Sequence, residues 1–287
     1  MKYLKEFSTK NDYLTYRDGN DYLKPNVSLS DDNGNVYYNF TPPIVYEAVD
    51  LGLPSGTKWA AQNVGARKPS DAGLYFQWGD TSGYTAEQVG TGDGKKKFSS
   101  DWSDYKWNPS HDGKTFTKYT KLGDKLELED DAAHVYMGGE WNMPSTDQIS
   151  ELINETTTAW TTSNGVSGMT FTSKKDTSKS IFIPAASAAL NGQVENSGLE
   201  GCVWSSILNT EDFCAEFNGE DGCSIDGAED FVFDLEEPEN VSSFGIDSGD
   251  DDTSSGDDTS GGEHIDSASN GSAPRYFGFS VRGVIDG

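Results

Sequence analysis

The last segment of the chain, RYFGFSVRGV from Arg275 to Val284, has the aromatic and β-branched composition of a β-strand. Directly before it, residues 248–272 read SGDDDTSSGDDTSGGEHIDSASNGS, which carries too little apolar surface to fold alone. A strand needs a neighbour for its backbone hydrogen bonds. The closing strand is therefore expected to pair with a segment far upstream, across this polar stretch.

Charge separates the last third of the chain from the rest. The 287 residues contain 21 Lys and Arg against 48 Asp and Glu, a net charge of -27. No Lys or Arg stands between Lys179 and Arg275. Because nucleic-acid affinity rests on basic residues that neutralise phosphates, we expect no nucleic-acid partner. Aromatic residues make up 12% of the chain, which argues against a wholly disordered protein.

Neither export nor metal chemistry is indicated by the sequence. The first residues, MKYLKEFSTKNDYL, lack the apolar part of an export signal, and no run approaches the roughly twenty apolar residues of a membrane span. We therefore expect neither Sec export nor membrane insertion. Cys202, Cys214 and Cys223 are an odd number without CxxC spacing, so we expect no disulfide framework and no zinc site. His111, His134 and His264 share no ligand spacing.

The N-terminal residues 1–43 are predicted to form a small separate module. A short helix is expected over Ser8–Arg17, which carries a Ser start and ends before a glycine. A hairpin is expected to follow, with Val27 and Leu29 on its first strand, Asn33–Gly34 in the turn, and Val36–Tyr38 on the second strand. Two prolines then end the module, since neither a helix nor a strand continues through them.

Residues 44–287 are predicted to form a loop-rich α+β domain with small sheets, because short apolar runs alternate with Gly, Asn and Asp. The clearest helix begins at Ser145, where Gln148 three residues later completes a capping box. KSIFIPAAS and GCVWSS are expected as buried strands. Four tryptophans stand at strand-like or motif positions and are expected in the core: Trp59, Trp78, Trp141 and Trp204.

Six segments in this order resemble the C-type-lectin-like fold of the formylglycine-generating-enzyme superfamily: VDLGLPSGTKWAAQNVGA, YFQWGD, LEDDAAHVYMGGEWNMPSTDQISELI, SIFIPAAS, GCVWSS and RYFGFSVRGV. More closely, they resemble the variable proteins that diversity-generating retroelements rewrite in gut bacteria and their phages. The resemblance extends over residues 46–284. The N-terminal module resembles leading segments of structural proteins from phages of gut Bacteroidales.

The resemblance implies that the first and last strands of the domain pair with each other. It also implies fixed scaffold strands at Trp204–Ser206 and Phe279–Arg282, with a ligand-facing surface formed by what lies between them. Alternation along DFCAEFN and the loop after it places one set of side chains outward. These candidate ligand-binding residues are Asp212, Cys214, Glu216, Asn218, Asp221, Cys223, Ser224 and Asp226. An ordinary solvated strand and loop is the alternative reading.

Three further features are candidates for binding. Trp102 and Trp107 stand in the polar segment DWSDYKWNP and are candidates for exposed ligand contact, with burial as the alternative. The acidic insertion at about residues 234–273 is expected to be flexible and solvated, because it lacks the ordered spacing of a calcium loop; Ca²⁺ ligation remains the alternative. Asp130 and Asp131 are expected to cap a helix rather than to form a catalytic pair.

The function that the resemblance implies is receptor binding by a phage tail protein. Its partners would be a glycan or protein on the host cell surface and other tail proteins, with a homotrimer as the expected assembly. The protein would be made in the host cytoplasm and reside in the virion. The alternatives are a bacterial lectin-fold adhesin and a structural virion protein without a receptor. No enzyme activity or cofactor is expected, since RYFGFSVRGV contains no cysteine of the superfamily's oxidase pair.

Overall fold

The computed structural model describes residues 3–6, 37–40, 43–195, 197–209, 227–235 and 266–287. The chain divides into two compact units, residues 1–45 and 46–287. In the first unit, β1 (Tyr3–Glu6) pairs antiparallel with β2 (Tyr37–Phe40). The expected return strand therefore exists, but its described partner is the N-terminal segment 3–6. The helix and the first hairpin strand predicted over residues 8–29 lie outside the described residues.

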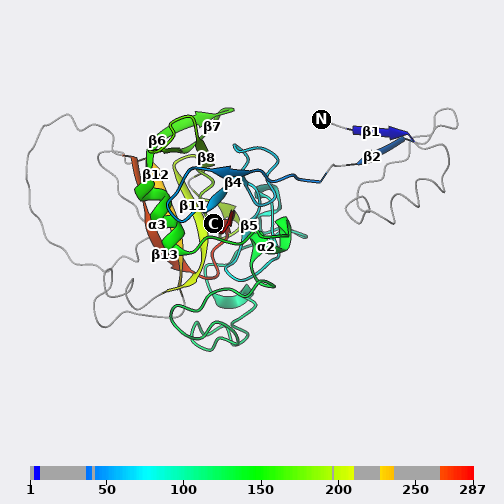
Figure 1. Cartoon of the computed structure of the whole chain (residues 1–287). Helices are drawn as coiled ribbons and strands as arrows, with labels where there is room; N and C mark the ends of the chain where they lie inside the picture. Colours follow the sequence, from blue (N-terminus) through cyan, green and yellow to red (C-terminus); the bar gives the residue numbers. More distant parts are fainter. Residues whose placement is uncertain (1–2, 7–36, 41–42, 196, 210–226, 236–265) are drawn as a thin grey trace, which may run out of the picture. The chain divides into compact units, whose positions relative to one another are not determined.

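The second unit is a mixed α+β structure of small sheets with few helices. Its largest sheet has five strands in the order β13, β12, β11, β14 and β5 (Figure 1). The bounds are β5 Tyr75–Phe76, β11 Glu200–Leu208, β12 Gly227–Leu235, β13 Asp266–Pro274 and β14 Phe279–Ser280. β11 pairs antiparallel with β12 and parallel with β14, so the sheet is mixed.

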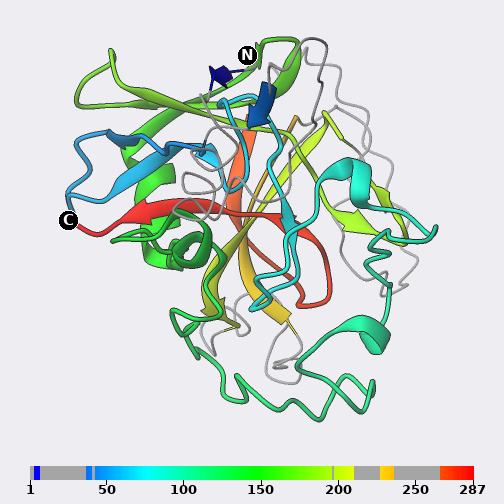
Figure 2. The same cartoon turned by 90° about the vertical axis from the view of Figure 1, so that its right-hand side faces the viewer.

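Two three-stranded sheets complete the scaffold. One joins β3 (Ala48–Asp50), β4 (Lys58–Asn63) and the C-terminal β15 (Arg282–Ile285), which lie side by side in Figure 2. The other is the meander β6 (Thr156–Ser163), β7 (Val166–Ser173) and β8 (Ser180–Pro184). A short hairpin adds β9 (Ala189–Leu190) and β10 (Gln193–Val194).

The closing segment RYFGFSVRGV forms two strands rather than the single one expected. β14 belongs to the five-stranded sheet, and β15 pairs with β4 near the start of the unit. Between them, the carbonyl of Val281 accepts a hydrogen bond from Val64 N at 2.8 Å. The change of sheet at Val281 is what lets one segment tie two sheets together. The prediction that the closing strand pairs far upstream is confirmed.

The helices form as their caps predict. α3 (Thr146–Glu155) begins after Ser145, whose side chain accepts from Gln148 N while Gln148 Oε1 accepts from Ser145 N, so the capping box is confirmed. Asp131 caps α2 (Ala132–Met137) by accepting from His134 N at 2.8 Å. Two 3-10 turns occur in the long connection before α2: η2 Ala86–Gln88 and η3 Trp102–Asp104.

Two hydrophobic clusters lie on opposite faces of the five-stranded sheet. Val203, Phe231 and Phe233 point to one face and pack with Ile149 and Leu152 of α3, which lies across β12 and β13 in Figure 1. On the other face the clustered residues include Cys202, Trp204 and Ala228. The expected core tryptophans Trp59, Trp78, Trp141 and Trp204 are all buried.

The acidic insertion is shorter than expected. Residues 234–235 belong to β12, and residues 266–273 belong to β13, which pairs with β12 along its whole length. The sequence of β13, DSASNGSAP, is too small and polar to indicate a strand by itself. It forms one because β12 offers a free edge and because small residues fit beneath α3, where Asn270 Nδ2 donates to Ser150 Oγ at 2.7 Å. Residues 236–265 lie outside the described residues.

Candidate functional site

The predicted ligand-binding strand and loop lie outside the described residues. This applies to Asp212, Cys214, Glu216, Asn218, Asp221, Cys223, Ser224 and Asp226, which belong to the connection 210–226. The described ends of that connection are held together. Asn209 Oδ1 accepts from Ser272 Oγ at 2.7 Å, and Asn209 N donates to Gly227 O at 3.4 Å. The candidate segment therefore begins and ends at one firmly held end of β11 and β12.

Trp102 and Trp107 are half-buried, and both have structural partners. Trp102 packs edge-on against Tyr105, Phe116 and Tyr276, with ring centroids 4.8 to 5.5 Å apart. Trp107 Nε1 donates to Gly79 O at 2.9 Å, and Lys106 Nζ lies 4.3 Å from the Trp107 ring centroid. Both indoles thus hold the long loop in place, and their ligand contact stays a hypothesis.

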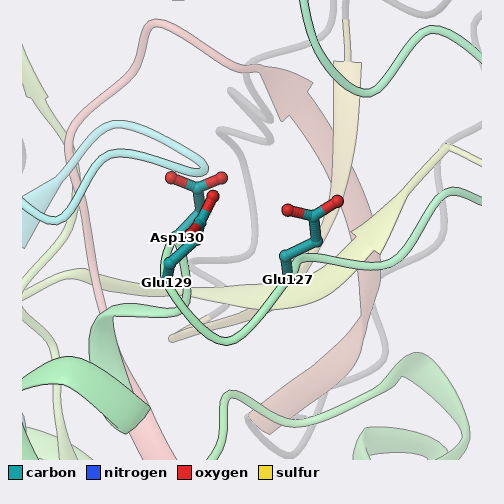
Figure 3. Close-up of side chains that lie close together, drawn as sticks. All are labelled: Glu127, Glu129 and Asp130. Carbon is teal, nitrogen blue, oxygen red and sulfur yellow. The ribbon is translucent and has the colours of Figure 1, made fainter.

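Three carboxylates gather in the loop before α2. Ligand oxygens of Glu127, Glu129 and Asp130 lie within 4.8 Å of one another, and Figure 3 shows the three side chains projecting to the same side of the loop. Lys118 Nζ contacts all of them, at 2.6 Å from Glu127, 3.1 Å from Glu129 and 2.5 Å from Asp130. The ammonium of Lys118 bridges all three carboxylates, so the group forms an internal ion-pair network.

The pKa shifts of this network agree with its contacts. Burial opposes ionisation of Asp130, but hydrogen bonds from Lys118 and Tyr119 outweigh burial and lower the pKa of the carboxyl. Burial likewise disfavours the charged ammonium of Lys118, yet its carboxylate partners raise the Lys118 pKa. Asp131 therefore caps α2 as expected, whereas Asp130 does not cap the helix and instead contacts Lys118 and Tyr119.

A second acidic group lies on the five-stranded sheet itself. Directly opposed residues of an antiparallel pair point to the same face, and the register opposes Glu200 to Asp234, Cys202 to Val232 and Trp204 to Asp230. The same alternation continues onto β13 at Ser269 and Gly271. We call this set the carboxylate face: Glu200, Cys202, Trp204, Asp230, Val232, Asp234, Ser269 and Gly271.

Exposure varies across the carboxylate face. Glu200, Val232, Asp234 and Gly271 are half-buried, and Ser269 is exposed. Asp230 is only 1% exposed, and Cys202 is buried with a free thiol. The rim of the face is therefore open to solvent while Asp230 lies deep. The opposite face of the same strands is covered by the cluster with α3.

Glu200 and Asp230 of the carboxylate face resist ionisation. Burial, followed by repulsion from Asp234, raises the pKa of Glu200 to about 6. Burial is also the main cause of the raised pKa of Asp230, with Glu200 and Glu229 adding to it. The pKa of the Cys202 thiol is raised first by burial and then by Glu200. A buried thiol with a raised pKa is a poor nucleophile.

Asp230 Oδ1 packs directly against Gly271 at the deepest point of the face. A Cβ atom built on Gly271 would lie 2.4 Å from Asp230 Oδ1, closer than such atoms approach. Asp230 Oδ1 is buried and has no hydrogen-bond partner within the described part of the chain. A buried carboxyl oxygen without a donor is unusual and costly.

Searches against protein-family models, curated proteins and solved structures return no match for this chain. No helix within the described ranges has the length and apolar character needed to cross a membrane.

Sequence reasoning missed the strand that carries this site. The segment GAEDFVFDL forms β12 although it contains three acids, Glu229, Asp230 and Asp234, which are uncommon in strands. Its apolar signal is the spacing of Phe231 and Phe233, two positions apart, which places both rings on one face of a strand. That phenylalanine alternation is the signal that predicts β12. The hairpin β6–β7 was missed too, although Asn164–Gly165 is a strong turn signal and both residues adopt positive φ (51° and 81°).

Proposed function

We propose that this chain is a receptor-binding protein of a phage tail, in which a C-type-lectin-like scaffold presents the carboxylate face to a receptor on the host cell. The resemblance of six ordered segments supports the lectin-like scaffold. The C-terminal β15 pairs with β4, the second strand of the unit, and not with the first strand, β3, so the sheet closes near the start of the unit but by a different strand pair from the one that the resemblance implies. The two segments that the resemblance implies as scaffold strands contain β11 and β14, which pair in parallel.

One observation carries the proposal of a binding surface. The strands β11, β12 and β13 are packed against α3 and the β6–β8 meander on one face, while the rim of the opposite face is open. The two long connections of the sheet, residues 210–226 and 236–265, start at opposite ends of β12. Loops at the ends of a rigid sheet are the usual place for recognition.

The separate N-terminal unit supports attachment to a larger assembly. Residues 1–45 form a compact unit distinct from residues 46–287. A tail protein needs one region for the particle and another for the receptor. A bacterial adhesin with the same scaffold is the second candidate, and it shares the proposed binding face.

Substituting Ser269 by tryptophan is expected to reduce binding of the full chain to host cells by at least about tenfold. Ser269 is exposed at the rim, and an indole there blocks a ligand whatever its charge. Binding of the labelled protein to a panel of gut Bacteroidales strains measures the effect. The matched control is Ser82→Trp, at another exposed position. Equal binding by both variants to a strain that the native protein binds would contradict the proposed face.

A further inference from the structure

We propose that the outer edge of β13 binds an extended segment of a protein partner, which adds a strand to the five-stranded sheet. β13 is the last strand in the order of this sheet, and it pairs with β12 along its whole length. In an antiparallel pair, every second residue turns its backbone N–H and C=O away from the neighbouring strand. β13 therefore presents a row of backbone donors and acceptors along its outer edge.

This outer edge is accessible in the part of the chain that the structure describes. No backbone hydrogen bond joins residues 268–273 to a described segment other than β12. Ser269 and Ser272 are exposed. Gly271 is half-buried, and because glycine has no side chain, the surface that it exposes is backbone. A second strand can therefore reach the backbone of β13.

β13 also lacks the features that usually protect the edge of a sheet. Natural edge strands are often very short, bent by a bulge, or marked by Lys or Pro. β13 has nine residues in continuous register with β12, contains no Lys or Arg, and has its single Pro at the last position. At the other edge of this sheet, β5 has only two residues, and Tyr75 is bridged to Tyr84. Strand addition therefore fits the β13 edge.

The side chains of β13 leave room for an added strand. Residues 268–273 read ASNGSA, in which no side chain is larger than asparagine. Asn270 turns toward α3, where its Nδ2 donates to Ser150 Oγ at 2.7 Å. Ser269 and Gly271 turn toward the carboxylate face. An added strand would gain main-chain hydrogen bonds from the edge and side-chain contacts on both faces of the sheet.

Charge indicates which kind of segment fits this edge. The chain has a net charge of -27, and no Lys or Arg occurs between Lys179 and Arg275. Asp147 is exposed on α3, one helical turn before the residue that contacts Asn270. A second copy of this chain would bring the same negative charge to the edge, whereas a segment that carries Lys or Arg is attracted to it. The partner is therefore a basic extended segment of another protein.

The test measures binding of the peptide acetyl-KTVTKTVTK-amide to the full chain by calorimetry at neutral pH and near-physiological salt. The control peptide acetyl-KTVPKPVTK-amide carries the same charge, but its prolines prevent it from pairing as a strand. The first peptide is expected to bind at least about tenfold more tightly, because only an extended backbone forms the hydrogen bonds of the edge. It is also expected to slow hydrogen exchange in residues 266–274, which the control peptide leaves unchanged.

Proline substitutions at two neighbouring positions test the edge itself. Of Ala268 and Ser269, one turns its N–H away from β12. Proline there removes an outward donor and keeps the pairing with β12, so one of Ala268→Pro and Ser269→Pro is expected to melt like the native chain. That variant is expected to bind the first peptide at least about tenfold more weakly. If neither variant folds, the two peptides and hydrogen exchange decide.

Equal affinity for the two peptides would overturn the inference, because it indicates diffuse attraction to an acidic protein. Absence of peptide binding would overturn it as well, as would native affinity in the folded proline variants. If light scattering shows a dimer of the native chain that a folded proline variant loses, a second copy occupies the edge instead. These outcomes are separate from the cell-binding assay of Ser269→Trp, which tests the proposed function of the carboxylate face.

Discussion

Replacing Arg275 by alanine is expected to lower the free energy of unfolding by about 3–5 kcal/mol. Arg275 is fully buried, and its guanidinium carbon lies 3.8 Å from the ring centroid of Phe116 and 5.6 Å from those of Trp78 and Tyr105. Its Nη1 donates to Tyr119 O at 3.1 Å. Desolvated cation–π contacts contribute about 2 kcal/mol or more, and the orphaned carbonyl adds a further cost.

Urea denaturation measures this effect, and Arg67→Ala serves as the control because Arg67 is an exposed arginine of the same unit. The control is expected to change the free energy of unfolding by about 0.5 kcal/mol or less. A loss below about 1 kcal/mol for Arg275→Ala would show that the aromatic rings pack equally well without the guanidinium. The residue would then not be the link between the long aromatic loop and the end of β13.

Replacing Asp230 by asparagine is expected to stabilise the fold at pH 8 by about 1–3 kcal/mol. The pKa of Asp230 is raised, mainly by burial and then by Glu200 and Glu229, so its ionised form is disfavoured in the folded state. The folded state therefore holds a proton that the unfolded chain has released. Stability is then lost as pH rises from the ordinary carboxyl pKa through the folded value, and asparagine removes that loss.

The pH dependence distinguishes this mechanism from a simple gain in packing. At pH 4, below the raised pKa, the benefit of Asp230→Asn is expected to shrink, while Asp93→Asn at an exposed site changes little at either pH. Other titratable groups on this face are Glu200, Cys202 and Asp234, and of these Glu200 and Cys202 also have raised pKa values. If Asp230→Asn stabilised the fold equally at pH 4 and pH 8, ionisation of Asp230 would not be the cause of the effect.

Local sequence signals predicted the helices and strands whose own residues favour the structure that they adopt. The helix after Ser145 follows from its capping box, and the strands at GCVWSS and SIFIP follow from their apolar runs. The upstream pairing of the C-terminal segment followed from the polar stretch before it. The helix and the two strands are determined by residues close together in the sequence. The upstream pairing is indicated by the small apolar content of residues 248–272.

The site depends on relations that a single sequence does not display. β13 is a strand because β12 and α3 accept its small residues, not because DSASNGSAP favours one. Asp230 is buried because the register sets it opposite Trp204. The cross-strand meeting of Glu200 and Asp234 likewise needs the pairing of segments more than thirty positions apart. Alternation instead favoured residues 212–218, which lie outside the described residues.

The central claim is that the solvent-open rim of the carboxylate face, on β11, β12 and β13, contacts the host receptor. Hydrogen exchange of the full chain, with and without cell-envelope extract from a strain that it binds, tests this most directly. The account predicts slower exchange in peptides that cover residues 227–235 and 266–274, with little change across the β6–β8 meander. Slower exchange confined to other regions, such as the loop that holds Trp102 and Trp107, would contradict it.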